Sequence, residues 1–263
     1  MQEHWGAPLR KGLFMYTHNV PGTESRLGPG EPFFFACHSG LDCFNTCCRN
    51  KHLPLTPYDV LRLKNGLGLH SDAFLSKHTL YRLDPESGFP VLNLRMKEAP
   101  ENPCPFVTPQ GCRVYADRPT ACRLYPLGRA VGQGSEAGEG RAFYFRLDPP
   151  ACLGTSEPKA WCAEDWERSQ GLEPYVRMND RMLSIVYHPA RNGRKPLNEQ
   201  QVQRVIVACY NLDIFRELVL TPRFLEIHPL EERTREQVAH DDNALLELGM
   251  AYLDQTLFPQ TGR

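Results

Sequence analysis

The sequence predicts an α+β protein in which a small, loop-rich domain of short strands and helices precedes a helical C-terminal region. Eight of the ten cysteines lie between Cys37 and Cys152, among short apolar runs that proline and glycine separate. After Gly171 the composition changes to apolar residues at helical spacing. We therefore expect an extended N-terminal arm over residues 1–30, a cysteine-cluster domain over 31–168 and a helical region over 169–263.

The composition is typical of a water-exposed globular protein. The chain has 263 residues, of which 41% are hydrophobic and 23% charged, and the net charge of −1 gives no sign of a nucleic-acid-binding surface. No apolar run approaches the length of about 18 residues that a membrane helix needs. The first residues lack a basic start and an apolar core, so we expect no secretory signal and a cytoplasmic protein.

Short elements are expected to present the cysteines. The aromatic run Pro32–Ala36 suits a buried strand that leads to Cys37, and residues 43–48 suit a tight turn or one helical turn. Thr56, Pro57 and Asp59 form a helix start with a capping hydroxyl, and Gly66 ends that helix. The remaining elements expected before residue 170 are a helix from Ser71, a hairpin over 79–96 and two short strands around a turn at 109–111. They continue with a short helix that begins at 117–119 and carries Cys122, a polar glycine-rich loop over 128–140, a strand over 142–147 and a helix from Cys162.

Three helices are predicted in the C-terminal region, over residues 179–187, 198–219 and 242–257. Cys209 lies on the apolar stripe of the second helix, so we interpret it as a core residue. No catalytic constellation is recognisable in this region.

So many thiols in few residues have three explanations: disulfides, zinc or an iron–sulfur cluster. A reducing cytoplasm disfavours disulfides. Zinc prefers Cys-x2–4-Cys pairs, and only Cys43, Cys47 and the neighbouring Cys48 supply one. We therefore favour an iron–sulfur cluster of the 4Fe–4S kind, with zinc as the alternative. The predicted ligands are Cys37, Cys43, Cys47, Cys48, Cys104, Cys112, Cys122 and Cys152.

The adjacent pair Cys47 and Cys48 limits the ways in which these ligands combine. Consecutive side chains diverge by about 100° on a helix and about 180° on a strand. Either the two thiols serve two metal centres, or one is a ligand and the other packs. Cys162, between two tryptophans, is either a ninth ligand or a half-buried thiol.

Arginines flank Cys122 in the Arg118-Pro119-x-x-Cys122-Arg123 motif. Guanidinium groups offset the negative charge of a thiolate cluster and raise its reduction potential, so Arg118, Arg123 and Tyr115 are predicted to surround the ligands. The alternative for the arginines is an ordinary surface ion pair, which contributes little.

The cysteine series resembles the YkgJ-type cysteine-cluster family of zinc- or iron-chelating domains. The resemblance covers residues 33–155 and rests on the opening cysteines, Cys104-Pro-Phe, Gly-Cys112-Arg-Val-Tyr115, Arg118-Pro119-x-x-Cys122-Arg123-Leu-Tyr-Pro126 and Cys152-Leu-Gly. The opening is wider than the family pattern, with five residues between Cys37 and Cys43. The family implies metal binding, and the flagellin lysine N-methylases look like distant relatives.

Three functions stay open at this point. The first is a cytoplasmic iron–sulfur protein in a redox or protein-modification role, with a redox partner or protein substrate. The second is a structural zinc module whose helices bind a partner. The third, implied by the resemblance alone, is a methylase-like enzyme that acts on a protein side chain. Nucleic acid and membranes are not expected partners.

Overall fold

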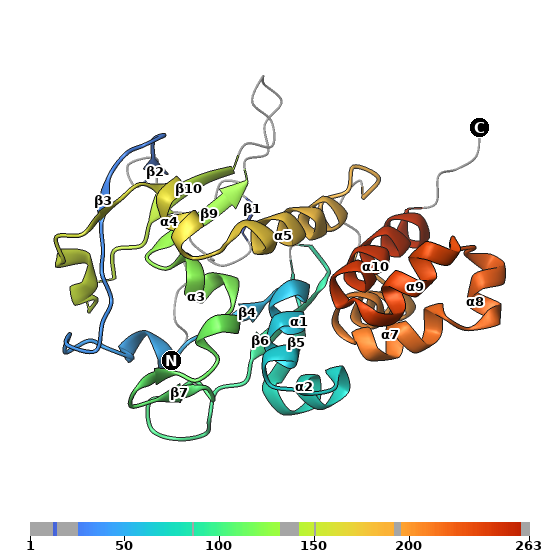
Figure 1. The fold of residues 1–263 in the computed structure, drawn as a ribbon, viewed down its shortest axis with the longest axis horizontal. Helices are drawn as coiled ribbons and strands as arrows, with labels where there is room; N and C mark the ends of the chain where they lie inside the picture. Colours follow the sequence, from blue (N-terminus) through green and yellow to red (C-terminus); the bar gives the residue numbers. More distant parts are fainter. Residues whose placement is uncertain are drawn as a thin grey trace. The chain divides into compact units, whose positions relative to one another are not determined.

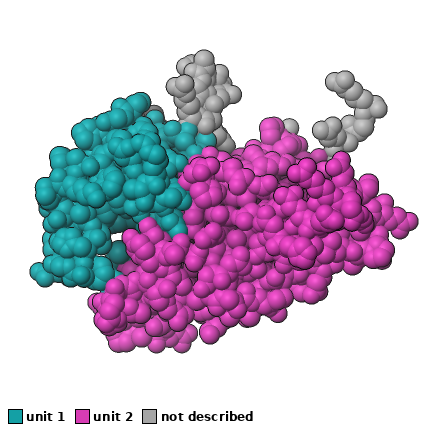
Figure 2. All heavy atoms as spheres, in the orientation of Figure 1, with its two compact units in different colours: residues 1–47, 121–172 teal, residues 48–120, 173–263 magenta. Residues whose placement is uncertain are grey.

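The structure is a computed structural model, and it describes residues 13–14, 26–85, 87–131, 142–149, 151–191 and 196–258. Contacts between residues divide the chain into two compact units, and each draws on two separate segments (Figure 2). The first unit comprises Met1–Cys47 and Ala121–Leu172, and the second comprises Cys48–Thr120 and Glu173–Arg263. The predicted divisions after residues 30 and 168 follow the order of the chain and stay a prediction.

Short antiparallel strands form the frame of the first unit. One sheet has the order β1-β9-β10-β2, and a separate pair joins β11 to β3. The elements are β1 (Leu13–Phe14), β2 (Arg26–Leu27), β3 (Phe33–Phe34), η2 (Thr46–Cys48, a 3-10 helix that ends one residue into the second unit), α3 (Thr120–Leu124), β9 (Leu127–Val131), β10 (Ala142–Arg146), η4 (Leu153–Ser156), β11 (Ala160–Trp161) and α4 (Ala163–Ser169).

An aromatic core holds these strands together. The ring of Phe35 packs edge-on against Trp166 and against Tyr125, with centroids 5.5 and 5.7 Å away. The indole N–H of Trp166 donates to the carbonyl of Leu124 at 2.9 Å, so the ring is buried with its polar atom satisfied. The predicted strand before Cys37 is confirmed as β3, which places the start of the cysteine series on this core.

The second unit contains a three-stranded antiparallel sheet and most of the helices. The sheet order is β4-β6-β5, and a two-stranded hairpin joins β7 to β8. Figure 1 shows β5 and β6 beside α1 and α2. The elements before residue 120 are β4 (Pro54–Leu55), α1 (Pro57–Gly66), α2 (Ser71–His78), β5 (Thr79–Leu83), β6 (Pro90–Leu94), β7 (Val107–Thr108), β8 (Gly111–Cys112) and η3 (Tyr115–Asp117).

Helix α1 begins as its sequence predicts. Thr56 accepts a hydrogen bond from the N–H of Asp59, and the Asp59 carboxylate accepts one from the N–H of Thr56, which completes a capping box. The same carboxylate accepts 2.7 Å bonds from the N–H and hydroxyl of Thr120. Asp59 is fully buried, and burial raises its pKa although these hydrogen bonds lower it. The Asp59 carboxylate that caps α1 therefore also fixes the position of Thr120, the residue that follows Arg118 and Pro119.

The C-terminal region is helical, as predicted. Its elements are α5 (Glu173–Val186), α6 (Glu199–Val205), η6 (Ile206–Tyr210), α7 (Leu212–Val219), α8 (Pro222–Ile227), α9 (Glu232–His240) and α10 (Asp242–Leu257). Helix α10 has the predicted bounds, whereas α5 begins six residues before the predicted start at 179. Pro174 explains the earlier start, because proline fits the first turn of a helix. Thr221 caps α8 just as Thr56 caps α1, a signal that sequence reasoning missed.

The single helix predicted over 198–219 is wrong. The chain forms α6, then the π-helical turn η6, and restarts as α7 after Asn211. A Cβ atom on Gly249 of α10 would lie 2.0 Å from the carbonyl oxygen of Ala208, so the absence of a side chain at Gly249 permits the close approach of α10 to the π turn. Cys209 is fully buried in this turn, which confirms it as a core residue.

We expect Gly249→Ala to destabilise the protein by about 1–3 kcal/mol, because the new methyl group would meet backbone that cannot rotate away. Urea unfolding at equal metal content measures this change. Gly28→Ala is the control, since its Cβ would meet only the Glu31 carboxylate at 3.4 Å. A stability equal to that of the unaltered protein would contradict the close helix approach.

The α+β class is confirmed, with short strands in small sheets and helices that dominate the C-terminal region. Most of the predicted arm over residues 1–30 and of the glycine-rich loop over 128–140 lies outside the described residues. For residues 128–131 the predicted loop is wrong, because they belong to strand β9 and pair with β10. Within the described ranges, no helix is both long enough and apolar enough to span a bilayer.

Candidate metal centres

Backbone contacts bring the two ends of the cysteine series together in the first unit. After β3, the N–H of Phe35 donates to the carbonyl of Lys159, and the N–H of Ala36 donates to that of Gly154 at 3.0 Å. A Cβ atom on Gly154 would lie 2.5 Å from the carbonyl oxygen of Ala36, so glycine permits this approach. Cys37 and Cys152, which flank these contacts, therefore lie in the same neighbourhood although the sequence separates them widely.

Four thiols gather there, and we call Cys37, Cys43, Cys47 and Cys152 the first cysteine group. The N–H of Leu153 donates to the Cys43 sulfur at 3.3 Å, which places Cys43 next to the Cys152 segment. The pKa of the Cys37 thiol is raised, first by burial and then by the neighbouring thiols of Cys47, Cys43 and Cys152. All four belong to the first unit.

Tyr125 borders the first cysteine group, and sequence reasoning missed it. Burial raises the pKa of its hydroxyl, and a hydrogen bond with Cys152 and the charges of Cys152, Cys47 and Cys43 raise it further. The tyrosine and Cys152 also pack against the aromatic core. Its place in the Arg123-Leu-Tyr125-Pro motif was the available signal. N–H and O–H donors to thiolate sulfur are a means of tuning a bound metal centre.

A second cysteine group, Cys48, Cys104 and Cys112, lies within the second unit. The N–H of Cys104 donates to the carbonyl of Cys48 at 2.8 Å. Cys112 lies in β8 opposite Val107 of β7, so the predicted turn does bring it near Cys104. The pKa of Cys104 is raised, first by burial and then by Cys112, against a hydrogen bond from the Phe106 N–H that lowers it.

The other three cysteines differ in setting. Cys122 lies exposed on α3, in the first unit. Cys162 caps α4, and its thiol donates to the Asp165 carboxylate at 3.2 Å. Cys209 is buried among apolar side chains, which raises its thiol pKa.

Both arginines of the cysteine motif are buried and donate to backbone carbonyls. Arg118 donates to the carbonyl of Tyr115 at 2.7 Å and stacks over the tyrosine ring at 3.9 Å. Arg123 donates to the carbonyl of Gln170 at 2.6 Å, at the end of α4. Their predicted influence on a thiolate centre stays a prediction.

The donor set suits a soft metal, because each group offers only sulfur. Thiolates are the preferred ligands of zinc and of iron–sulfur clusters. Within the described ranges, no three Cys, His, Asp or Glu side chains have the spacing that would already hold one metal ion. To bind a metal ion, the neighbouring thiols of a group must therefore rotate toward one another.

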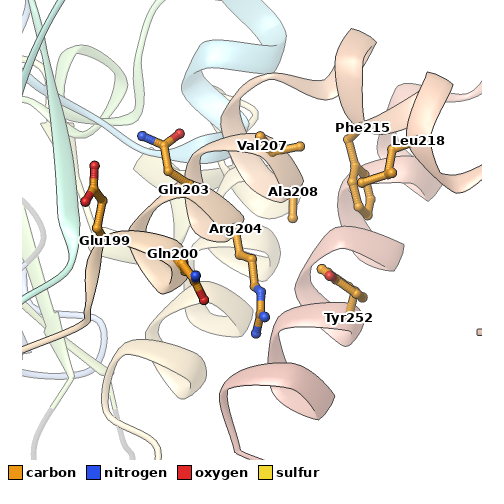
Figure 3. A pocket seen from close by; sticks show the side chains of 9 residues that line it. All are labelled: Glu199, Gln200, Gln203, Arg204, Val207, Ala208, Phe215, Leu218 and Tyr252. Atoms are coloured by element: carbon orange, nitrogen blue, oxygen red, sulfur yellow. The ribbon is translucent and has the colours of Figure 1, made fainter. Parts of the chain in front are cut away.

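The helical region contains a cavity of about 540 Å³ that is separate from the thiols. Figure 3 shows Gln200 and Arg204 of α6 on one side and Tyr252 of α10 on the other. The full lining is Glu199, Gln200, Gln203, Arg204, Val207, Ala208, Phe215, Leu218 and Tyr252. No cysteine is among these residues, so the cavity is no part of either cysteine group.

Comparison with known proteins identifies the cysteine-rich segment. Residues 36–152 match the family model CxxCxxCC, described as "Putative zinc- or iron-chelating domain". No curated protein and no solved structure matches the chain. The matched segment contains all eight predicted ligand cysteines and both cysteine groups. This match confirms the cysteine-cluster resemblance for the segment from residue 36 to residue 152.

Proposed function

We propose that the chain is a cytoplasmic iron–sulfur protein with a redox or protein-modification role, in which the first cysteine group holds a 4Fe–4S cluster. The observation that carries this proposal is the convergence of Cys37, Cys43, Cys47 and Cys152, since four thiolates complete the usual ligand set of such a cluster. Zinc sites usually combine two closely spaced pairs, but only Cys43 and Cys47 of this group form such a pair, which favours a cluster over zinc.

The second cysteine group supports a different role. Cys48, Cys104 and Cys112 supply three thiols within their unit, and three protein ligands leave one position of a four-coordinate metal for another ligand. A closed four-thiolate centre suits electron transfer, whereas a centre with an open position can bind a substrate. A protein substrate or a redox partner remains part of this proposal.

Metal and sulfide analysis of protein purified without oxygen tests the proposal. We expect a brown protein with broad absorption near 400 nm, bound iron and acid-labile sulfide. A colourless protein with stoichiometric zinc and no sulfide would refute the iron–sulfur assignment and support the structural zinc module. Methyl transfer from S-adenosylmethionine to a co-purifying protein would instead support a methylase-like activity.

A further inference from the structure

Strand β5 lies at the edge of its sheet. The sheet order β4-β6-β5 leaves one side of β5 without a neighbouring strand among the residues that the structure describes. The other side pairs with β6 in the register Leu80↔Asn93 and Arg82↔Val91. Edge strands offer unpaired N–H and C=O groups to another strand.

The hydrogen-bond pattern shows which backbone groups of β5 face outward. The N–H of Arg95 donates to the carbonyl of His78, and that of Asp84 donates to the carbonyl of Phe89, both at 2.8 Å. Because bonded pairs alternate along an antiparallel ladder, Leu80 and Arg82 also bond to β6.

The residues between them, Thr79, Tyr81 and Leu83, therefore turn their N–H and C=O groups to the free edge. The Thr79 N–H closes α2 by donating to the carbonyl of Leu75, and the Thr79 carbonyl accepts a 2.9 Å bond from the Arg95 guanidinium. Tyr81 and Leu83 are left as the outward-facing positions for an added strand.

The side chains of this edge are unusually apolar for an exposed strand. Leu80, Tyr81 and Leu83 are 50%, 53% and 47% exposed. Successive side chains point to opposite faces, so apolar surface is exposed on both sides of the strand. Natural edge strands usually carry charge or proline to prevent pairing, and here only Arg82 interrupts the apolar run.

The charges at this edge point to an acidic partner. The side chains of Arg82 and of the exposed Lys77 make no hydrogen bond or ion pair with any residue in the described part of the chain. The neighbouring acid, Asp84, is already engaged, because its carboxylate accepts 2.7 Å bonds from the N–H and hydroxyl of Ser87. Among the residues that the structure describes, the edge therefore presents cations and no free carboxylate with which to complement a second copy of itself.

We propose that β5 binds an extended segment of a partner protein, rich in acidic and apolar residues, which joins the β4-β6-β5 sheet as a fourth strand. Tyr81 would exchange both backbone hydrogen bonds with the added strand, and Leu83 would extend the pairing. Apolar side chains of the segment would cover Leu80, Tyr81 and Leu83, and a carboxylate would pair with Arg82. Neither β5 nor its neighbour β6 contains a cysteine.

A blocked octapeptide of alternating valine and glutamate, flanked by threonine, tests the proposal on the full metal-containing chain. We expect amide exchange of Tyr81 and Leu83 to slow about tenfold or more when the peptide binds. The same peptide with lysine in place of glutamate, and one with its alternate amides methylated, should bind at least about tenfold more weakly.

Two variants separate the backbone from the charge contribution. Tyr81→Pro removes an outward N–H that the β5–β6 ladder does not use, so the sheet should persist while peptide binding weakens about tenfold or more. Arg82→Glu should reverse the preference from the acidic to the lysine peptide. The proposal is overturned if the acidic peptide leaves Tyr81 and Leu83 unprotected or if Tyr81→Pro binds it unchanged. A dimer that Tyr81→Pro dissociates would also overturn it, in favour of self-association.

Discussion

Cys47→Ser is expected to remove metal from the first cysteine group alone, and Cys48→Ser from the second alone. The two cysteines are neighbours in sequence, but Cys47 belongs to the first compact unit and Cys48 to the second. They lie in the 3-10 helix η2, where consecutive side chains diverge by about 120°. We therefore expect one thiol to turn toward each group, as the two-centre interpretation of the adjacent pair requires.

The expected loss is large, because the partners that merely orient a metal ligand already account for about 10–100-fold in metal affinity. Each single variant should retain the metal of the other group, and the double variant should lose both. Iron, zinc and sulfide contents of the three variants, purified in parallel without oxygen, measure this.

Cys162→Ser is the matched control, since the same change at the cap of α4 lies outside both cysteine groups and should leave the metal content unchanged. If Cys47→Ser and Cys48→Ser each removed all the metal, or if the double variant lost no more than either single one, the two-centre model would fail. If neither variant lost metal, the pair would be structural.

Local signals in the sequence predict much of this fold because the forces involved act between near neighbours. Thr56, Pro57 and Asp59 specify the start of α1 within one helical turn, and the apolar spacing of residues 242–257 specifies α10. The interruption of the predicted helix over 198–219 at Asn211 has another origin. The apolar stripe continues through Cys209, but the close approach of Gly249 to the Ala208 carbonyl is a tertiary contact that periodicity cannot reveal.

The grouping of the cysteines likewise depends on contacts between distant segments, which local sequence signals do not reveal. Spacing and compartment predict that the thiols serve a metal, but they cannot show which thiols meet. Cys152 reaches Cys37 because the backbone of Ala36 bonds to Gly154, and Cys104 reaches Cys48 through its own N–H. Both contacts join segments far apart in the sequence, so only the folded chain separates a four-thiol group from a three-thiol group.

Lys64→Met is expected to destabilise the second unit by about 3–5 kcal/mol, the cost of removing one member of a buried ion-pair network. Lys64 is only 4% exposed on α1, and its ammonium lies 3.0 Å from Asp242 of α10 and 3.4 Å from Asp213 of α7. Arg216 pairs with both carboxylates, and Ser71 donates two 2.7 Å bonds to Asp213. The network thus links α1, α2, α7 and α10. Urea unfolding at neutral pH measures the loss.

Lys77→Met is the control, because Lys77 is exposed on α2 and its loss should change stability by no more than about 0.5 kcal/mol. A Lys64→Met variant as stable as this control would show that the network contributes no net stability.

The pH dependence of the Lys64→Met deficit distinguishes a lost charge from lost packing. Burial alone would raise the pKa of Asp213 and of Asp242, but hydrogen bonds and the charge of Lys64 lower both below the usual range. Groups with a lowered folded-state pKa stabilise the protein above their unfolded pKa of about 3.9, and this contribution disappears as the pH falls through the folded value.

Without Lys64 the pKa values of Asp213 and Asp242 rise, so less of the stability depends on ionised carboxylates. The difference between the variant and the unaltered protein should therefore shrink as the pH falls below about 5. A deficit that stayed constant over that range would assign the effect to the packing of the lysine stem, because packing does not titrate.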